Sequence, residues 1–388
     1  MCDLRYNTNL TNLGHGTNVM DIMELMMQSQ PRIGYWLSSK KKKKLKFEEF
    51  EELCKEAGIE IVQIDLEAPL ADQGPFDVIL HKVTDELVIR AEEGDVAAET
   101  KMNEIKEFGH EHPEVVVLDP LDQTLRLRDR YTMYTVLQQC NIMQSDHNVF
   151  VPATVELQTK DVETNCRLIA SAGLTYPVLC KPSLADGTDN SHVMLIVFNE
   201  ESLQDIEPPC VAQTLINHDG VLHKIFVIGD RHYIVQRPSL KNLSAGAFQP
   251  EKFHTRDVSK PDSTSHLNDA YDRLCCELEF GELHRRGLTL FTPNLNHSLR
   301  RQNSFCSEPD PVVLSHIASS LRQTLKLDLF GVDVVIDSTN GKYAVIDVNP
   351  FPGYDGVEDF PKKLLQHIQE RMMLVKSDPP NSSDEDAP

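Results

Sequence analysis

The chain has 388 residues, of which 40% are hydrophobic and 25% charged, the composition of an ordinary globular protein. Because single hydrophobic cores stop growing beyond roughly 250 residues, this length predicts two or three domains. The formal net charge of −22 argues against a general nucleic-acid binder, since an acidic surface repels phosphate backbones, and any anionic ligand must therefore be held by a local basic pocket.

The first ordered block is predicted to be an α/β domain over residues 32–119. Residues 1–31 are polar and weakly patterned, and we expect a disordered N-terminal extension there. The strand RIGYWLS is followed by a helix over 47–57 that stops at Gly58, the strands IEIVQIDL and DVILHKV, a helix over about 97–110, and the strand EVVVLDP. This alternation of strands and helices predicts an open, mostly parallel sheet.

Two further blocks are predicted to form a central domain, 120–213, and a C-terminal domain, 214–376. The central block has a helix over 131–140 and the strands YPVLCKP, VMLIVF and PPCVAQTLI. The last block opens with a hairpin about Gly229-Asp230 and closes with a helix near 317–327, the strands LFGVDVVID and KYAVIDVNP, and a helix to about 375. We expect a mobile polar insertion at about 281–311 and a disordered acidic tail at 377–388.

The segment GVDVVIDSTNGKYAVIDVNPFPGY has two strand patterns on either side of Asn340-Gly341, which predicts a β-hairpin. Alternation puts Asp347 and Asn349 on one face. A two-residue turn would leave Asp333 one position out of register with Asp347, whereas a one-residue bulge or a three-residue loop would set them opposite each other. Two carboxylates and an amide oxygen would then suit Mg²⁺, with phosphate oxygens completing its octahedron. The alternative is an exposed polar face, although carboxylates that interrupt apolar strands are costly to bury unpaired.

Cationic side chains also interrupt apolar strands in the middle of the chain. Lys181 ends YPVLCK and Lys224 interrupts VLHKIFVI, and each must reach either water or an anion. The intervening loop ADGTDNSH has small polar residues that suit close approach to phosphate, but it is not a Walker A motif.

The spacing of the cysteines and the hydropathy of the chain predict the cellular compartment. The nine cysteines include no C-x-x-C pair, so they are interpreted as reduced thiols that pack in the core. No run of about 18 apolar residues predicts a membrane span, and the start of the chain lacks the pattern of a signal peptide. We expect a cytoplasmic protein, with a nuclear fraction as an alternative.

Several separated motifs, in order, resemble the ATP-grasp inositol phosphate kinases, that is, the inositol-tetrakisphosphate 1-kinase (inositol-trisphosphate 5/6-kinase) family. They are GYWLS, VILHKVTD, VLDP with LRDR after it, LCKP, NSH, QTLINH with VLHK after it, VQRPSLKN, SKPDSTS, LFGVDVVI and VIDVNPFPGY. The resemblance covers residues 32 to about 370. It implies an ATP-grasp fold of three domains, with ATP held between the central and C-terminal sheets.

The resemblance also implies roles for individual residues. The implied metal ligands for two Mg²⁺ ions are Asp333, Asp347 and Asn349. The implied ATP contacts are Arg130, Lys181, Gln213, Ile216, Lys224, Ser239, Thr255 and Ser259. The implied contacts to the phosphorylated inositol ring are Lys41, Lys82, His192, Lys224, Asn349 and Gly353. Lys181, His192 and Lys224 would assist the transfer itself.

The implied reaction is direct phosphoryl transfer from ATP to inositol 3,4,5,6-tetrakisphosphate at position 1 and to inositol 1,3,4-trisphosphate at position 5 or 6. We expect a monomer with no nucleic-acid or membrane partner. One departure matters: the loop ADGTDNSH stands where the animal form has AHGTNSH, so one residue is inserted and Asp186 replaces a histidine. The alternatives are a catalytically weak inositol-polyphosphate sensor and an ATP-grasp carboxylate–amine ligase.

The lysine run SKKKKKLKF, which starts at Ser39, has three interpretations: a nuclear import signal, a solvated helix start, or a positive rim for a polyphosphorylated substrate. Its position after the first strand puts it at the carboxyl end of a parallel sheet, where α/β folds bind ligands. We assign direct contact to Lys41 and interpret Lys42, Lys43 and Lys44 as a steering field.

Overall fold

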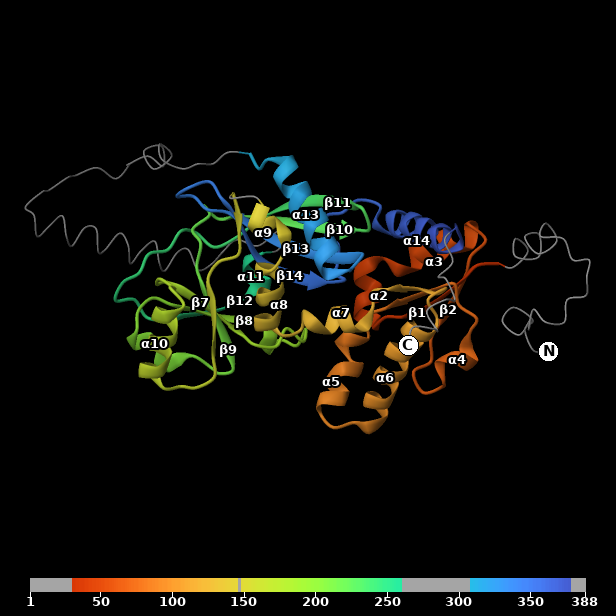
Figure 1. The fold of residues 1–388 in the computed structure, drawn as a ribbon, viewed down its shortest axis with the longest axis horizontal. Coiled ribbons are helices and arrows are strands. Elements are labelled where there is room, and N and C mark those ends of the chain that lie inside the picture. Colours follow the sequence, from red (N-terminus) through yellow and green to blue (C-terminus); the bar gives the residue numbers. More distant parts are fainter. Residues whose placement is uncertain (1–29, 146–147, 260–307, 378–388) are drawn as a thin grey trace, which may run out of the picture. The chain divides into compact units, whose positions relative to one another are not determined.

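The computed structural model describes residues 30–145, 148–259 and 308–377 (Figure 1). The predicted N-terminal extension as far as residue 29, the predicted insertion as far as residue 307 and the predicted acidic tail from residue 378 lie outside the described residues. The described chain forms two compact units. Unit 1 contains residues 30–125, 327–329 and 351–377, and unit 2 contains residues 126–326 and 330–350.

Unit 1 is built on the predicted parallel sheet. Its four strands are β1 (Arg32–Trp36), β2 (Glu60–Gln63), β3 (Val78–His81) and β4 (Val116–Leu118), in the order β2-β1-β3-β4 with every pair parallel. All four β3 residues are buried, as expected for a parallel strand covered on both faces. Gly34 is required in β1, because a Cβ there would lie 2.7 Å from the Phe76 ring.

Helices cover this sheet. The two predicted helices are observed as α3 (Phe47–Glu56) and α6 (Val96–Glu111), and α14 (Phe360–Ser377) from the far end of the chain packs against α3 and β4 (Figure 1). Four short helices were not expected from the sequence: α4 (Leu70–Gln73), η2 (Val83–Asp85), α5 (Leu87–Glu92) and α7 (Leu121–Arg126).

The lysine run itself forms a helix, α2 (Ser39–Leu45). The Ser38 hydroxyl caps it by accepting from the Lys41 backbone N–H at 3.2 Å, and lysines in its last turn complement the helix dipole. Lys41 and Leu45, one helical turn apart, are buried, whereas Lys43 and Lys44 are exposed.

The first sheet of unit 2 is antiparallel, in the order β12-β8-β7-β9-β6. Its strands are β6 (Thr154–Leu157), β7 (Val178–Pro182), β8 (Val193–Val197), β9 (Cys210–Thr214) and β12 (Glu251–His254). Associated with it are α10 (Val162–Ser171), η3 (Asn190–His192), η4 (Glu201–Asp205) and α11 (Thr255–Val258). A buried apolar cluster that includes Leu157, Ile169 and Val197 joins α10 to this sheet.

The second sheet of unit 2 has the order β11-β10-β13-β14-β5. Its strands are β5 (Val149–Phe150), β10 (Val221–Ile228), β11 (Arg231–Pro238), β13 (Leu329–Ile336) and β14 (Tyr343–Pro350). The predicted hairpin between β10 and β11 is confirmed, because Ile228 pairs with Arg231 and Gly229 has φ +58°, which suits a II′ turn.

Three helices accompany the second sheet: α8 (Arg130–Gln138), α9 (Asn141–Ser145) and α13 (Pro311–Leu325). The last of these begins earlier than expected. Asp310 caps it by accepting from the Val312 N–H at 2.8 Å, and Pro311 is tolerated in the first turn, where its missing N–H costs nothing.

The pairing of strands does not follow chain order. β5 lies in the segment assigned to the central domain but pairs with β14, and β12 lies in the segment assigned to the C-terminal domain but pairs with β8. The domain boundaries proposed from the sequence therefore describe stretches of chain rather than separate sheets, and they remain a proposal.

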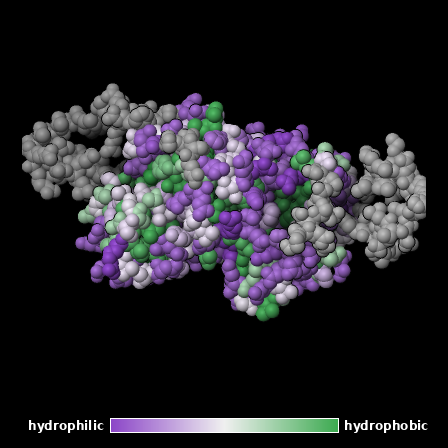
Figure 2. Space-filling view, in the orientation of Figure 1, coloured by the Kyte–Doolittle hydropathy of each residue, from purple (hydrophilic) through white to green (hydrophobic). Residues whose placement is uncertain are grey.

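The visible face of the molecule is covered mainly by hydrophilic side chains, with hydrophobic ones in small scattered patches (Figure 2). Within the described ranges, no helix combines the length and the apolar composition that crossing a bilayer requires.

Candidate functional site

The predicted hairpin near the end of the chain is confirmed as β13 and β14, but its turn is not the expected Asn-Gly pair. The Asp337 N–H donates to the Lys342 carbonyl at 2.8 Å, so four residues, 338–341, form the loop. The Asp337 carboxylate organises it by accepting from the Thr339 N–H at 2.8 Å and from the Thr339 hydroxyl at 2.6 Å. These hydrogen bonds to Asp337 explain the longer turn, and the alternation of apolar and polar residues in the sequence does not reveal them.

A β-bulge brings the two predicted metal carboxylates together. Asp333 lies directly opposite Asp347, while Val334 already pairs with Val345, so Ile346 is the extra residue on β14. Of the two arrangements considered from the sequence, a bulge and a three-residue loop, a bulge is observed, but it accompanies a four-residue loop and not the two-residue turn that was expected.

These two carboxylates and Asn349 form an oxygen-rich group. The Asn349 amide nitrogen donates to Asp347 Oδ2 at 3.1 Å, so its oxygen remains an acceptor. Lys224 Nζ forms a short ion pair with Asp333 Oδ1. Burial raises the pKa of Asp333, the Lys224 ammonium opposes that shift, and the neighbouring Asp347 charge adds to it.

This group fits Mg²⁺. Two carboxylates at adjacent strand positions repel each other and are relieved by a divalent cation, and their hard oxygens are the ligands that Mg²⁺ prefers. Among the described residues no group of three or more His, Cys, Asp or Glu side chains could hold a metal ion. The set here contains two acids and one amide, so further ligands would have to come from a bound phosphate.

Lys181 is held next to this group by three acceptors. Its ammonium donates to the Tyr134 hydroxyl at 2.6 Å, to Gln213 Oε1 at 2.9 Å and to the Ile346 carbonyl at 3.0 Å. Burial lowers the pKa of Lys181 to about 8, an effect that the nearby Asp347 charge partly offsets. The contact to Ile346 joins β7 of the first sheet to β14 of the second.

Gln213 has a donor without a partner. The side chain is 2% exposed, its oxygen accepts from Lys181, and its Nε2 is buried without a hydrogen bond to any described residue. An unsatisfied buried donor is costly, so it fits a ligand that offers an acceptor atom at this position. Ile216, two residues past the end of β9, packs on the apolar cluster of Leu222, Val335 and Ala344.

Arg130 is buried and binds main-chain carbonyls. Its guanidinium donates to the carbonyls of Pro182 and Leu184, which precede the loop ADGTDNSH, and of Ser191, which lies within it. Within that loop the Asp186 carboxylate accepts from the Thr188 N–H at 2.9 Å and from its hydroxyl at 2.7 Å. Burial would raise the pKa of Asp186, but these hydrogen bonds outweigh it and lower the pKa.

His192 lies at the end of the same loop. Its Nδ1 is 3.2 Å from the Thr255 hydroxyl, and its ring centroid is 5.5 Å from that of His254. Burial lowers the pKa of His192, and the nearby cationic side chains lower it further. The Ser259 N–H donates to the Thr255 carbonyl, whereas Ser239 contacts His218, which is at 2.8 Å. The structure therefore groups His192, Thr255 and Ser259, and gives Ser239 a different neighbour.

The remaining predicted substrate residues belong to unit 1. Lys41 Nζ donates to the carbonyls of Phe351, at short range, and Pro352, at 2.6 Å, and lies 4.1 Å from the centre of the Phe351 ring. Lys82 Nζ donates to the same Phe351 carbonyl at 3.2 Å. Gly353 follows directly, and a Cβ there would collide with the end of the Lys44 side chain.

Asp119 anchors the segment that these lysines contact. Its buried carboxylate accepts from the N–H groups of Asp328 at 2.7 Å and Leu329 at 2.9 Å, and the Leu329 carbonyl accepts from the Phe351 N–H at 2.6 Å. Burial raises the pKa of Asp119 to about 7, despite these two hydrogen bonds.

Sequence reasoning missed Asp119 and Tyr134 as supports of the site. Asp119 is part of the VLDP motif, which contributes to the family resemblance but does not indicate what Asp119 does. Tyr134 lies inside a helix, where an aromatic residue at an apolar position is interpreted as core.

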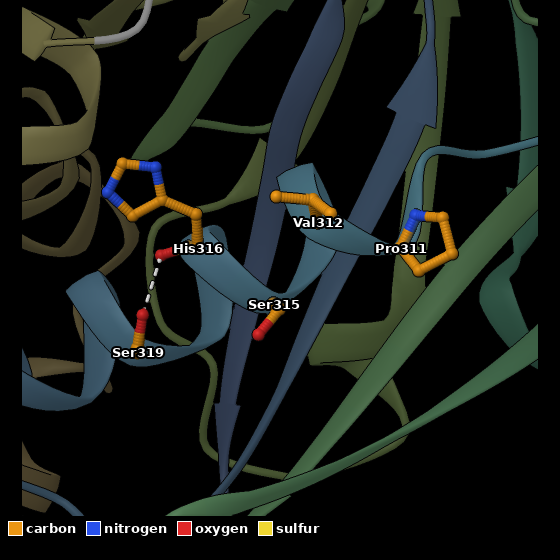
Figure 3. A pocket seen from close by; sticks show the side chains of 5 residues that line it. All are labelled: Pro311, Val312, Ser315, His316 and Ser319. Carbon is orange, nitrogen blue, oxygen red and sulfur yellow. Dashed lines mark hydrogen bonds between the residues drawn. The ribbon is translucent and has the colours of Figure 1, made fainter.

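A shallow hollow on α13 does not belong to this site. Pro311, Val312, Ser315, His316 and Ser319 line it, and the Ser319 hydroxyl donates to the His316 carbonyl at 3.2 Å (Figure 3). None of the predicted site residues lies there.

Comparison with known proteins identifies the family. Residues 32–124 match the inositol 1,3,4-trisphosphate 5/6-kinase pre-ATP-grasp domain, and residues 143–370 match the ATP-grasp domain of the same family. The inositol-tetrakisphosphate 1-kinases of Xenopus laevis and Danio rerio are 38% and 39% identical over 339 residues, which is 87% of this chain and 78% of each relative. Inositol-tetrakisphosphate 1-kinase 4 of Glycine max is 33% identical, over 83% of this chain and 82% of the relative.

Solved structures agree on the fold. D-cycloserine synthetase has a TM-score of 0.52 at 12% identity, covering 88% of this chain and 99% of that one. A RiPP-associated ATP-grasp ligase from Chryseobacterium gregarium has a TM-score of 0.52 at 14% identity, covering 88% and 97%. Such distant likeness supports the ATP-grasp architecture alone, and the predicted fold class is confirmed. By sequence, this chain belongs to the inositol 1,3,4-trisphosphate 5/6-kinase family.

Proposed function

We propose that the protein is an ATP-dependent inositol polyphosphate kinase, with inositol 3,4,5,6-tetrakisphosphate as acceptor at position 1 and inositol 1,3,4-trisphosphate as acceptor at position 5 or 6. The names of its relatives support the activity, and the arrangement of Asp333, Asp347 and Asn349 beside Lys181 and Lys224 carries the chemistry. Phosphoryl transfer needs alignment and charge neutralisation more than covalent catalysis, and this group of side chains offers both.

The nucleotide side of the reaction uses residues of unit 2. Mg²⁺, as two ions held by Asp333, Asp347 and Asn349, would neutralise phosphate charge when bound. Lys181 would contribute a cation to the phosphates, and the unpaired Gln213 donor would recognise an acceptor atom of the nucleotide. Arg130 would act by ordering the loop ADGTDNSH, because its guanidinium binds the Ser191 carbonyl within the loop and the Pro182 carbonyl before it. Ile216, Ser239, Thr255 and Ser259 complete the proposed nucleotide contacts.

The acceptor side of the reaction is assigned to basic side chains. We assign the phosphates of the inositol ring to Lys41, Lys82, His192 and Lys224, with Asn349 and Gly353 contributing hydrogen bonds from an amide and the main chain. Lys181, His192 and Lys224 would stabilise charge on the transferred group. Lys224 is paired with Asp333, so binding of a cation at Asp333 would release its ammonium toward a phosphate.

The test is incubation with ATP, Mg²⁺ and a panel of inositol tris- and tetrakisphosphates, with products identified by NMR. We expect one added phosphate on an inositol ring and stoichiometric ADP. Tight binding of an inositol polyphosphate without ADP release would favour the sensor, and trapping of an acyl phosphate by hydroxylamine would favour the ligase; either result overturns the kinase proposal. A monomeric state and a cytoplasmic location remain predictions.

A further inference from the structure

The bulge in β14 leaves a carbonyl that the ladder does not use. Ile346 is the extra residue opposite the β13 pair Asp333 and Val334, and such a residue is left unpaired by its partner strand. A backbone carbonyl in the interior needs a donor from elsewhere. Two side chains supply it: the Tyr134 hydroxyl donates at 2.9 Å and the Lys181 ammonium at 3.0 Å.

Tyr134 is placed to connect three elements. It lies on α8, is 1% exposed, and its hydroxyl donates to Ile346 of β14 while accepting from Lys181 of β7 at 2.6 Å. The Lys181 ammonium also lies 5.3 Å from the centre of the Tyr134 ring. Burial, with the negative charge of Asp347, raises the pKa of Tyr134 well above its ordinary value, so the phenol remains protonated and keeps donating.

We propose that Tyr134 is a positioning residue: its hydroxyl holds the bulge that sets Asp347 opposite Asp333, and at the same time fixes the Lys181 ammonium beside that bulge. This inference rests on the proposed function, because it assigns Asp347 to the cation and Lys181 to the nucleotide phosphates. One oxygen atom thereby couples the two groups that neutralise phosphate charge.

Removing the Tyr134 hydroxyl should weaken nucleotide binding without unfolding the protein. In Tyr134→Phe the Ile346 carbonyl keeps one donor, Lys181, and Lys181 keeps two acceptors, Gln213 and Ile346. The fold should therefore survive, but the bulge and the ammonium lose their common anchor. Losing one net hydrogen bond predicts about fivefold weaker binding of the nucleotide in the presence of the cation.

The experiment compares ADP binding by isothermal titration calorimetry across a Mg²⁺ series for wild type, Tyr134→Phe and the matched control Tyr131→Phe, whose side chain is on the same helix and 42% exposed. We expect about fivefold weaker ADP binding at saturating Mg²⁺, and a higher half-saturating Mg²⁺ concentration, in Tyr134→Phe only. KM for the inositol phosphate should stay within twofold of wild type in both variants. In an Asp347→Asn background, Tyr134→Phe should no longer change the Mg²⁺ dependence, because the group it positions is gone.

Other results would contradict either the role of Tyr134 or the proposed function. If Tyr134→Phe matches Tyr131→Phe, or weakens ADP and inositol phosphate equally with and without Mg²⁺, then Tyr134 only packs and the inference is overturned. If wild type neither binds Mg²⁺ with ADP nor phosphorylates any inositol phosphate, the proposed function fails instead. Should Tyr134→Phe not fold, para-fluorophenylalanine at position 134 fills the space of the hydroxyl without donating, and carries the same expectations.

Discussion

Replacing Lys41 by methionine should weaken the reaction through the inositol phosphate alone. Five consecutive lysines share one stretch of chain, yet only Lys41 is buried, with its ammonium directed to the carbonyls of Phe351 and Pro352 beside Gly353. The exposed Lys43 on the same helix is the matched control, since Lys43→Met removes the same unit of charge from the same region.

The expected changes in kcat/KM distinguish a direct contact with the substrate from a long-range electrostatic effect. A hydrogen bond between charged groups contributes about 1.5–3 kcal/mol, so Lys41→Met should lower kcat/KM for inositol tetrakisphosphate about 10- to 150-fold. A solvated charge roughly 10 Å away contributes about 0.1 kcal/mol per substrate charge at physiological salt, so Lys43→Met should lower kcat/KM by about threefold or less. The Lys43→Met effect should disappear at high salt, while the Lys41→Met effect should remain.

The assay is initial-rate kinetics with each substrate varied, together with urea unfolding. Methionine at position 41 removes the Lys41 donor from the Pro352 carbonyl and leaves Lys82 as the side-chain donor to the Phe351 carbonyl, so a loss of about 1–3 kcal/mol in the free energy of unfolding is expected as well. KM for ATP should not change. The reasoning is refuted if Lys41→Met loses that stability while its kcat/KM for the inositol phosphate equals that of Lys43→Met, because Lys41 would then only brace the 351–353 segment.

Three further outcomes are expected. Because burial lowers the pKa of Lys181 to about 8, kcat/KM for ATP should fall as the pH rises through about 8. The Lys181→Arg variant should have a lower kcat/KM that stays constant from about pH 7 to 9.5. The same fall in both proteins would contradict this prediction. Because burial raises the pKa of Asp119 to about 7 from about 3.9 in an unfolded chain, the folded state binds more protons between these values. Stability should then fall as the pH rises through that window, by at most about 4 kcal/mol relative to Asp119→Asn in urea unfolding; a constant difference would contradict it. Mg²⁺ at one hundred times its dissociation constant should raise the free energy of unfolding by about 2.7 kcal/mol, an increase that chelation reverses and Asp347→Asn lacks; equal stabilisation of the variant would argue against this ligand.

Local patterning predicted much of the fold correctly. Alternating strands and helices gave the parallel sheet of unit 1, and the Gly229-Asp230 turn gave the β10–β11 hairpin. The strand register allowed Asp333 to lie opposite Asp347 through a bulge or a three-residue loop, and the two do lie opposite each other, through a bulge combined with a four-residue loop. These features depend on residues close together in the chain.

The site residues that the sequence did not reveal have hydrogen-bond partners far away in the chain. Asp119 reaches the backbone at Asp328, and Tyr134 reaches Ile346, so no local pattern distinguishes either from an ordinary buried residue. Arg130 stays a predicted ATP contact, and the carbonyls of Pro182 and Ser191 that its guanidinium binds lie 52 and 61 residues away in the chain. A lysine run has no apolar periodicity, so the sequence does not single out α2 as a helix, although Ser38 is a residue that can cap one.

The most direct test is a count of divalent ions bound with a non-hydrolysable ATP analogue, using Mn²⁺ in place of Mg²⁺ and electron paramagnetic resonance to measure the free ion. Wild type should bind two Mn²⁺ per chain, and Asp347→Asn should lose at least one of them or bind it at least tenfold more weakly, with its fold intact by circular dichroism. Equal stoichiometry and affinity in the two proteins would contradict the assignment of the β13–β14 carboxylates as the cation site.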